Sequence, residues 1–86
     1  MRVTTTKKFD KKVKNLPKKI QKELARRLTI FMNDVHDPFL RTHKLSGKLK
    51  DLWSFSVSGD IRVVFDMSYR EVAILIDIGS HSDLYK

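Results

Sequence analysis

The 86-residue sequence contains no cysteine, only three glycines and only two prolines. Without cysteine it has neither a disulfide framework nor a thiolate zinc site, which fits a reducing compartment. The longest apolar run, Val72 to Ile76, is far too short to cross a membrane, and Met1 leads into no secretory signal. We therefore expect one small cytoplasmic domain over residues 1–86, with no membrane contact.

Motifs for several common chemistries are also missing. The three glycines form no phosphate-binding loop, and no G-x-S-x-G nucleophile turn is present. The three histidines, His36, His43 and His81, include no helical pair four residues apart that could bind a metal. These absences disfavour nucleotide-dependent and ordinary hydrolase chemistry, and they predict neither a metal nor a small-molecule cofactor.

Acidic residues are scarce in the first part of the chain. Residues 1–50 hold fifteen Lys or Arg against four Asp or Glu, a net charge of +11, whereas residues 51–86 hold three against six, a net charge of −3. The sum, +8, is large for this length and favours a polyanionic partner such as RNA or the ribosome. The plainer alternative is a soluble surface on a small basic protein.

Hydrophobic periodicity predicts the order strand, helix, helix and three strands. Residues 2–6 form a short β-branched strand, and Thr5 or Thr6 can cap a helix that begins near Lys7. A second helix is expected over residues 17–33. Its apolar stripe consists of Ile20, Leu24, Leu28, Phe31 and Val35. The fold class is therefore α+β, with two N-terminal helices packed as a hairpin on one face of a small, mainly antiparallel β-sheet.

The sheet is predicted from a change of period after an irregular loop over residues 39–50. Trp53, Phe55 and Val57 alternate with serines, and a turn over residues 58–60 leads into the next strand. Apolar residues of both strands are odd-numbered, so we expect two cross-strand pairs. These pairs are Val57 with Ile61 and Ser56 with Arg62.

A third strand is expected over residues 72–78, in the interior of the sheet because it is apolar on both faces. The face of the sheet away from the helices is expected to be polar and shallowly concave. It would carry Ser54, Ser56, Arg62 and Val64.

Two residues stand out as candidates for chemistry. Arg62 lies in the middle of a strand, where its planar guanidinium suits phosphate binding or, equally, an ion pair with Asp66 or Asp77. His81 follows an apolar strand and Gly79, and its imidazole can exchange a proton near neutral pH. Taken alone, His81 is better explained as an ordinary exposed terminal residue.

Other candidates have equally plain alternatives. Tyr85 can stack on a base or bind a phosphate oxygen, or else anchor the end of the chain. Asp60 and Asp83 can act as an acid–base pair, although Asp60 is also a good turn residue. A basic loop before the sheet suits contact with phosphates or is simply solvated. Its members are His43, Lys44, Lys48 and Lys50.

Three segments resemble the RelE/ParE superfamily of bacterial toxins, and most of all its RelE, YoeB and YafQ branch. They are "LPKKIQKEL", "HKLSGKLKDLWSFSVSGDIRVVFDM" and "ILIDIGSHSDLY". The resemblance covers nearly the whole chain, and its specificity lies in the order and spacing of L-x-G-x-x-x-x-x-W-S, G-D-x-R-V-V-F and I-G-x-H-x-x-x-Y. It implies a compact α+β sandwich that cleaves mRNA in the ribosomal A site without a metal, and a cognate antitoxin that wraps and neutralises it.

The resemblance also implies roles for individual residues. The RNA 2′-hydroxyl attacks the adjacent phosphate, which requires a base, an acid and cations. Arg62 would stabilise the phosphate, His81 would be the general acid or base, and Tyr85 would orient the nucleotide. His43 and Asp60 match further YafQ-like positions. Phosphate contacts would come from the basic loop through Lys44, Lys48 and Lys50.

One departure from the family pattern affects the mechanism. YafQ-like sequences carry a histidine on the first hairpin strand where this chain has Ser56, and a serine is no base at neutral pH. His43 or Asp60 would have to fill that role. ParE-like relatives inhibit DNA gyrase instead, but His81 and Tyr85 favour the ribonuclease branch. A non-enzymatic basic binding module, or a decayed toxin, is the third alternative.

Overall fold

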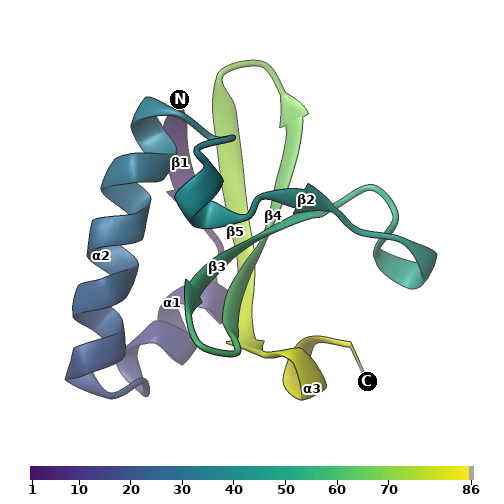
Figure 1. Cartoon of the computed structure of the whole chain (residues 1–86). Helices are drawn as coiled ribbons and strands as arrows, with labels where there is room; N and C mark the ends of the chain where they lie inside the picture. The colour runs from purple at the N-terminus through teal and green to yellow at the C-terminus, as the bar shows by residue number, and fades with distance from the viewer. Residues whose placement is uncertain (86) are drawn as a thin grey trace.

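The structure, a computed structural model, describes residues 1–85 as a five-stranded sheet with helices α1 and α2 on one face (Figure 1). The elements along the chain are β1 (Arg2–Thr5), α1 (Lys7–Lys14), α2 (Lys18–Asn33), η1 (Pro38–Leu40), β2 (His43–Lys44), η2 (Gly47–Leu49), β3 (Trp53–Ser58), β4 (Ile61–Tyr69), β5 (Val72–Ser80) and α3 (His81–Leu84). The strand order is β1-β5-β4-β3-β2, and only the β1–β5 pair is parallel. The predicted α+β class is confirmed. No helix within residues 1–85 is long and apolar enough to cross a membrane.

The core lies between α2 and the sheet. Phe31 of α2 packs against Phe55 and Phe65 with ring centroids 4.9 Å away in each case, and all three rings are fully buried. Rings tilted or edge-on at this separation are favourable aromatic pairs. Phe31 and Leu24, two members of the predicted stripe, are the buried residues of α2. Helical periodicity therefore identified the face that packs on the sheet.

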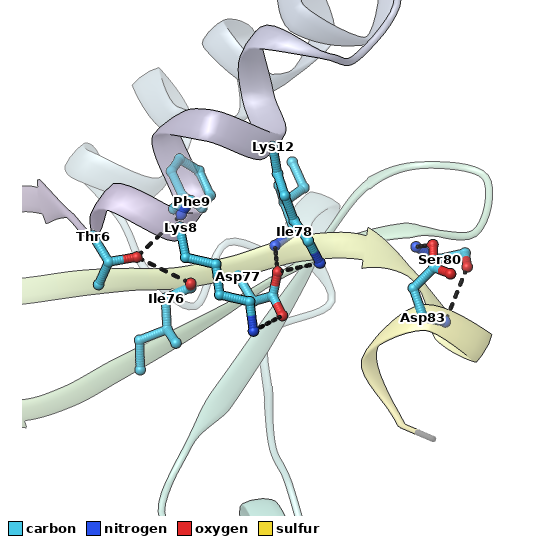
Figure 2. A network of polar contacts seen from close by, with 9 residues as sticks. All are labelled: Thr6, Lys8, Phe9, Lys12, Ile76, Asp77, Ile78, Ser80 and Asp83. Carbon is cyan, nitrogen blue, oxygen red and sulfur yellow. Dashed lines mark hydrogen bonds and ion pairs between the residues drawn. The ribbon is translucent and has the colours of Figure 1, made fainter.

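Helix α1 is fastened to β5 by polar contacts as well as by the buried ring of Phe9. The Thr6 hydroxyl accepts from the N–H of Phe9 at 3.1 Å and donates to the carbonyl of Ile76 at 3.1 Å, so the predicted cap is also a tie to the sheet. Lys8 and Lys12 reach from the same helix to the carboxylate of Asp77 (Figure 2). The sheet therefore holds α1 in place at both a neutral and a charged contact.

The hairpin between β3 and β4 matches one predicted pair and not the other. Ser56 faces Arg62 as expected, but Ile61 faces Ser58, so the predicted Val57–Ile61 pair is wrong. A register shift between Ser56 and Ser58 adds one residue to β3, which a β-bulge does. Gly59 adopts a positive φ of 52° in the tight turn, and the bulge lets Val57 stay fully buried.

Two further expectations are corrected. The loop over residues 39–50 contains β2 and two 3₁₀ turns, which are too short to impose a period on the sequence. The face away from the helices is not open along its length, because Ser54 is fully buried and Val64 is nearly so. The η2 segment and α3 lie on this side of the sheet (Figure 1). The predicted polar face is therefore exposed only at one end of the sheet, near Ser56 and Arg62.

Candidate active site

A hollow of about 340 Å³ lies where β2, β4 and α3 meet, and it gathers most of the predicted site residues. It is lined by His43, Lys44, Leu45, Ser46, Arg62, His81 and Tyr85. The lining comes from three segments that are far apart in the sequence. The β-sheet register and the short helix α3 bring them together.

Arg62 lines this hollow and has no hydrogen-bond or ion-pair partner among residues 1–85. Its cross-strand neighbours are Ser56 on β3 and Gly79 on β5, and its Nε is buried with no hydrogen-bond partner among residues 1–85. Neither Asp66 nor Asp77 pairs with it. Asp77 is bound by two lysines, and Asp66 accepts from the N–H of Ser68. A buried donor that lacks a partner is costly, so this guanidinium suits an anionic ligand better than a structural ion pair.

Helix α3 brings two of the lining residues to the hollow, and its position depends on Gly79. A Cβ at Gly79 would stand 3.2 Å from the Cβ of Asp83, so the glycine allows α3 to pack against the end of β5. Ser80 and Asp83 form a capping box, in which each side chain accepts from the other's backbone N–H (Figure 2). Asp83, which the sequence offered as an acid–base partner of Asp60, therefore helps to form the helix.

His81 and Tyr85 lie one helical turn apart on α3 and contact each other. Their ring centroids are 4.5 Å apart, with the planes at 61°. The backbone N–H of His81 donates to Oδ2 of Asp60 at 3.2 Å, which ties α3 to the β3–β4 turn. The hydroxyl of Tyr85 is buried and has no partner among residues 1–85. Asp60 therefore holds the backbone of His81, while Tyr85 lines the hollow and has a hydroxyl that no group within residues 1–85 uses.

The second imidazole of the site, that of His43, is oriented by a hydrogen bond with the backbone two residues earlier. Nδ1 of His43 lies 3.0 Å from the carbonyl oxygen of Arg41. A carbonyl only accepts, so we assign the proton to Nδ1 in the neutral ring. This tautomer leaves Nε2 of His43 with a free lone pair, as a general base requires.

The basic loop is divided among different surfaces. Lys44 lines the hollow with Arg62, whereas Lys48 lines an adjoining hollow with Ser46, Leu49, Leu84 and Tyr85. Lys50 is exposed and lines neither. The structure thus brings only part of the predicted phosphate-binding set together.

Two residues missed or misplaced by sequence reasoning adjoin the site. Ser54 is fully buried, and its hydroxyl is the third side-chain group that lacks a partner among residues 1–85. Its only signal in the sequence is a serine within a strand of large apolar residues. Ser56, at the position of the family's histidine, lines a different hollow with Arg27 and Phe39. Within the described chain, no three His, Asp or Glu side chains cluster in a way that could hold a metal ion.

Solved structures with this fold are small bacterial toxins. E. coli YafQ is 18% identical with a TM-score of 0.82, and the match covers 100% of both chains. YafQ in the E. coli DinJ–YafQ complex is 19% identical with a TM-score of 0.80, again over 100% of both chains. A metal-bound toxin from Helicobacter pylori is 28% identical with a TM-score of 0.68, over 99% of both chains. The chain thus has the fold of E. coli YafQ and of a YoeB/ParE toxin from Agrobacterium tumefaciens.

The family follows from the sequence match. A family model described as "Bacterial toxin of type II toxin-antitoxin system, YafQ" matches residues 1–86. The chain belongs to this family of type II toxins, as its resemblance to the YafQ branch predicted. No curated protein matches the chain in a sequence comparison.

Proposed function

We propose that this toxin is an endoribonuclease that cleaves mRNA on the ribosome and so inhibits translation in the cytoplasm. The observation that carries the proposal is the composition of one hollow. It holds a guanidinium and a phenol with buried, unpartnered polar atoms, two imidazoles and a lysine. Cations and proton-transfer groups around one vacant space are what phosphodiester cleavage by an internal hydroxyl requires.

In the proposed reaction His43 is the general base. Its Nε2 takes the proton from a ribose 2′-hydroxyl as the oxygen attacks the neighbouring phosphorus. The hydrogen bond that Nδ1–H donates to the carbonyl of Arg41 stabilises the imidazolium that forms. His43 thus supplies the general base that Ser56 cannot be, and no histidine on β3 is needed.

Arg62 and Lys44 stabilise the charge that develops on the phosphate. The guanidinium offers donors that no group within residues 1–85 uses, so its hydrogen bonds are available to the pentacoordinate phosphorane. A fixed donor aimed at developing charge contributes about 10²–10³ in rate. Lys44 adds a second positive charge from β2.

His81 is then the general acid, and Tyr85 orients the nucleotide. A protonated His81 gives its proton to the departing 5′-oxygen, which leaves a 2′,3′-cyclic phosphate on one fragment and a 5′-hydroxyl on the other. The Asp60 carboxylate fixes the backbone of His81. The edge contact with Tyr85 restricts the imidazole ring, and the phenol hydroxyl remains free to bind the substrate.

We further propose that a cognate antitoxin binds this chain, as the DinJ–YafQ complex from E. coli shows for that toxin. The net charge of +8 favours an acidic segment in the antitoxin. Such a protein would shield the cationic surface until the toxin is released.

The test is cleavage on translating ribosomes. The toxin is expressed with its antitoxin, separated from it and added at micromolar concentration to ribosomes that are translating a defined mRNA. We expect fragments with a cyclic phosphate at the 3′ end, and the loss of both toxicity and cleavage in His81→Ala. If the wild type leaves the mRNA intact and blocks supercoiling by DNA gyrase, the chain is a gyrase inhibitor. If it does neither and does not slow growth, the non-enzymatic alternative holds.

A further inference from the structure

A second hollow lies at the edge of β3, next to the proposed active site, and it is not part of the proposed cleavage reaction. It has a volume of about 400 Å³, within the range of small-ligand sites. Its lining consists of Arg27, Pro38, Phe39, Arg41, Ser56, Ser58 and Gly59. The combination of an aromatic ring, two arginines and two hydroxyls is typical of a site for single-stranded nucleic acid.

Phe39 presents its ring to solvent from a fixed backbone. The side chain is 52% exposed, whereas its neighbour Leu40 is fully buried and anchors the η1 turn in the core. The carboxylate of Asp37 accepts from the N–H of Phe39 at 2.9 Å. An aromatic ring exposed on a short, anchored turn is not explained by packing.

Arg27 holds that ring from one side. Its guanidinium carbon lies 4.1 Å from the centre of the Phe39 ring, and Nη1 donates to the carbonyls of Phe39 and Ser56 at 3.1 and 3.0 Å. Nε is paired with Glu23 at 2.9 Å, and the side chain is only 13% exposed. Arg27 is thus held by the protein through Nε and Nη1 and supports one face of the Phe39 ring, so a ligand can stack on the other face.

The remaining charge of this hollow belongs to Arg41. Its side chain is exposed, and its guanidinium forms no ion pair with any of residues 1–85. It adopts a positive φ of 53° at the end of η1. Arg41 therefore adds an uncompensated cation beside the ring.

The two hollows adjoin each other at two points. The carbonyl of Arg41 binds the ring of His43, which lines the proposed active site. On the sheet, Ser56 of the second hollow is the cross-strand neighbour of Arg62 in the first. A polynucleotide whose phosphate is bound by Arg62 can therefore continue directly into the Phe39 hollow.

We propose that the Phe39 hollow is a nucleotide subsite. A base of the RNA strand, next to the phosphate that is cleaved, stacks on the free face of Phe39, and Arg41 contacts the backbone phosphate of that nucleotide. The proposal rests on the ribonuclease function proposed above. Stacking is tolerant of base identity, so the subsite holds the strand in register more than it selects a sequence.

The test measures the affinity of the purified full-length toxin for a short single-stranded RNA that carries 2′-O-methyl riboses and so cannot be cleaved. Phe39→Leu keeps an apolar side chain but removes the ring. We expect it to weaken binding about 5- to 150-fold, the range for loss of one stacked base. Phe39→Trp should bind as well as the wild type. The matched control is Tyr69→Leu, which removes an aromatic ring that is 61% exposed at the far end of β4.

A series of abasic oligonucleotides locates the contact. One abasic position should weaken binding to the wild type but not to Phe39→Leu, because the ring and the base act as a pair. The inference is overturned if Phe39→Leu binds like Tyr69→Leu, or if no abasic position distinguishes it from the wild type. It is also overturned if the substitution weakens only the antitoxin complex, which would make the hollow a protein-binding site. If the wild type neither binds RNA nor cleaves mRNA, the ribonuclease proposal fails as well.

Discussion

Two charged residues on neighbouring interior strands of the sheet have opposite surroundings. Asp77 of β5 is bound by Lys12 at 2.7 Å, by Lys8 at 3.1 Å and by the N–H of Ile78 at 2.8 Å (Figure 2). Arg62 of β4 lines a hollow, and its buried Nε has no hydrogen-bond partner within residues 1–85. The first charge is satisfied within the protein, while the second is satisfied only when something binds.

This difference separates the parts of the sheet that serve stability from those that serve function. The partners of Asp77 come from α1, and they fasten that helix to the strand. Elsewhere, three buried polar groups within residues 1–85 lack partners, namely the Ser54 hydroxyl, the Arg62 Nε and the Tyr85 hydroxyl. A protein that leaves such groups unpaired gives up stability at a site where ligand binding recovers it.

Removal of Arg62 should produce the largest change in activity with none in folding. We expect Arg62→Met to lower cleavage of ribosome-bound mRNA about 10²–10³-fold, because a fixed donor to the phosphorane is lost. Methionine keeps the apolar part of the side chain and removes an unsatisfied donor, so the midpoint of thermal unfolding should stay or rise. Cleavage and unfolding are measured on the same preparation.

Arg62→Lys provides the matched control for charge. Lysine keeps the positive charge but lacks the planar fork, so we expect an intermediate rate. Full activity in Arg62→Met would show that the hollow is not the site of phosphate cleavage. A fall in the unfolding midpoint of that variant by several degrees would show that Arg62 has a structural partner after all.

Removal of the Asp77 charge should have the converse effect, on stability alone. Burial by itself would raise the pKa of Asp77, but hydrogen bonds from Lys12 and Lys8 and from the N–H of Ile78 outweigh it, and the pKa lies below its ordinary value of 3.8. Asp77→Asn keeps the shape and loses the charge. We expect a cost of about 1–3 kcal/mol at pH 7, with each kcal/mol lowering the midpoint by about 4–8 °C.

The stabilisation by Asp77 should depend on pH in a definite direction. The pKa of Asp77 is lower in the folded state, so its stabilisation is complete above the unfolded pKa and is lost as the pH falls through the folded pKa. Urea unfolding of the wild type and Asp77→Asn should therefore differ at pH 7 and converge below about pH 4. A difference that does not change with pH would mean that packing, not charge, connects α1 to β5.

The contrast between Asp77 and Arg62 also explains which parts of the fold could be predicted from the sequence. The apolar stripe of α2 and the alternation of apolar and polar residues in β3 and β4 follow directly from which side chains are buried. The layers of the fold and the Ser56–Arg62 pair were therefore predictable from the sequence. The bulge at Val57 was not, because it depends on how the turn at Gly59 closes. β2 has two residues and α3 has four, about one period of a strand and of a helix, so neither can show a repeating pattern, although Ser80 and Asp83 do carry the spacing of a capping box.

The site was predictable only through the residue types that carry chemistry. Arg62, His81 and Tyr85 stood out individually, but the sequence could not show that β4, β2 and α3 surround one hollow. It also gave equal weight to an ion pair between Arg62 and Asp77. Only the three-dimensional arrangement shows that two lysines from α1 already bind that carboxylate. Which charges are already paired is decided by tertiary contacts between distant segments.

Substitutions of Asp60 should have the smallest effect on cleavage, and they distinguish a positioning role of Asp60 from a role as acid or base. Its carboxylate accepts from the backbone N–H of His81 at 3.2 Å, which makes it a positioning residue that acts through α3. Asp60→Asn keeps an oxygen acceptor and should cleave ribosome-bound mRNA within about threefold of the wild type, whereas Asp60→Ala should lose about tenfold through misplacement of His81. Both variants should keep the pH–rate profile of the wild type, because Asp60 exchanges no proton in the reaction. Equal and larger losses in the two variants, with one limb of the profile missing, would instead make Asp60 the acid or base and leave His81 dependent on the capping box alone.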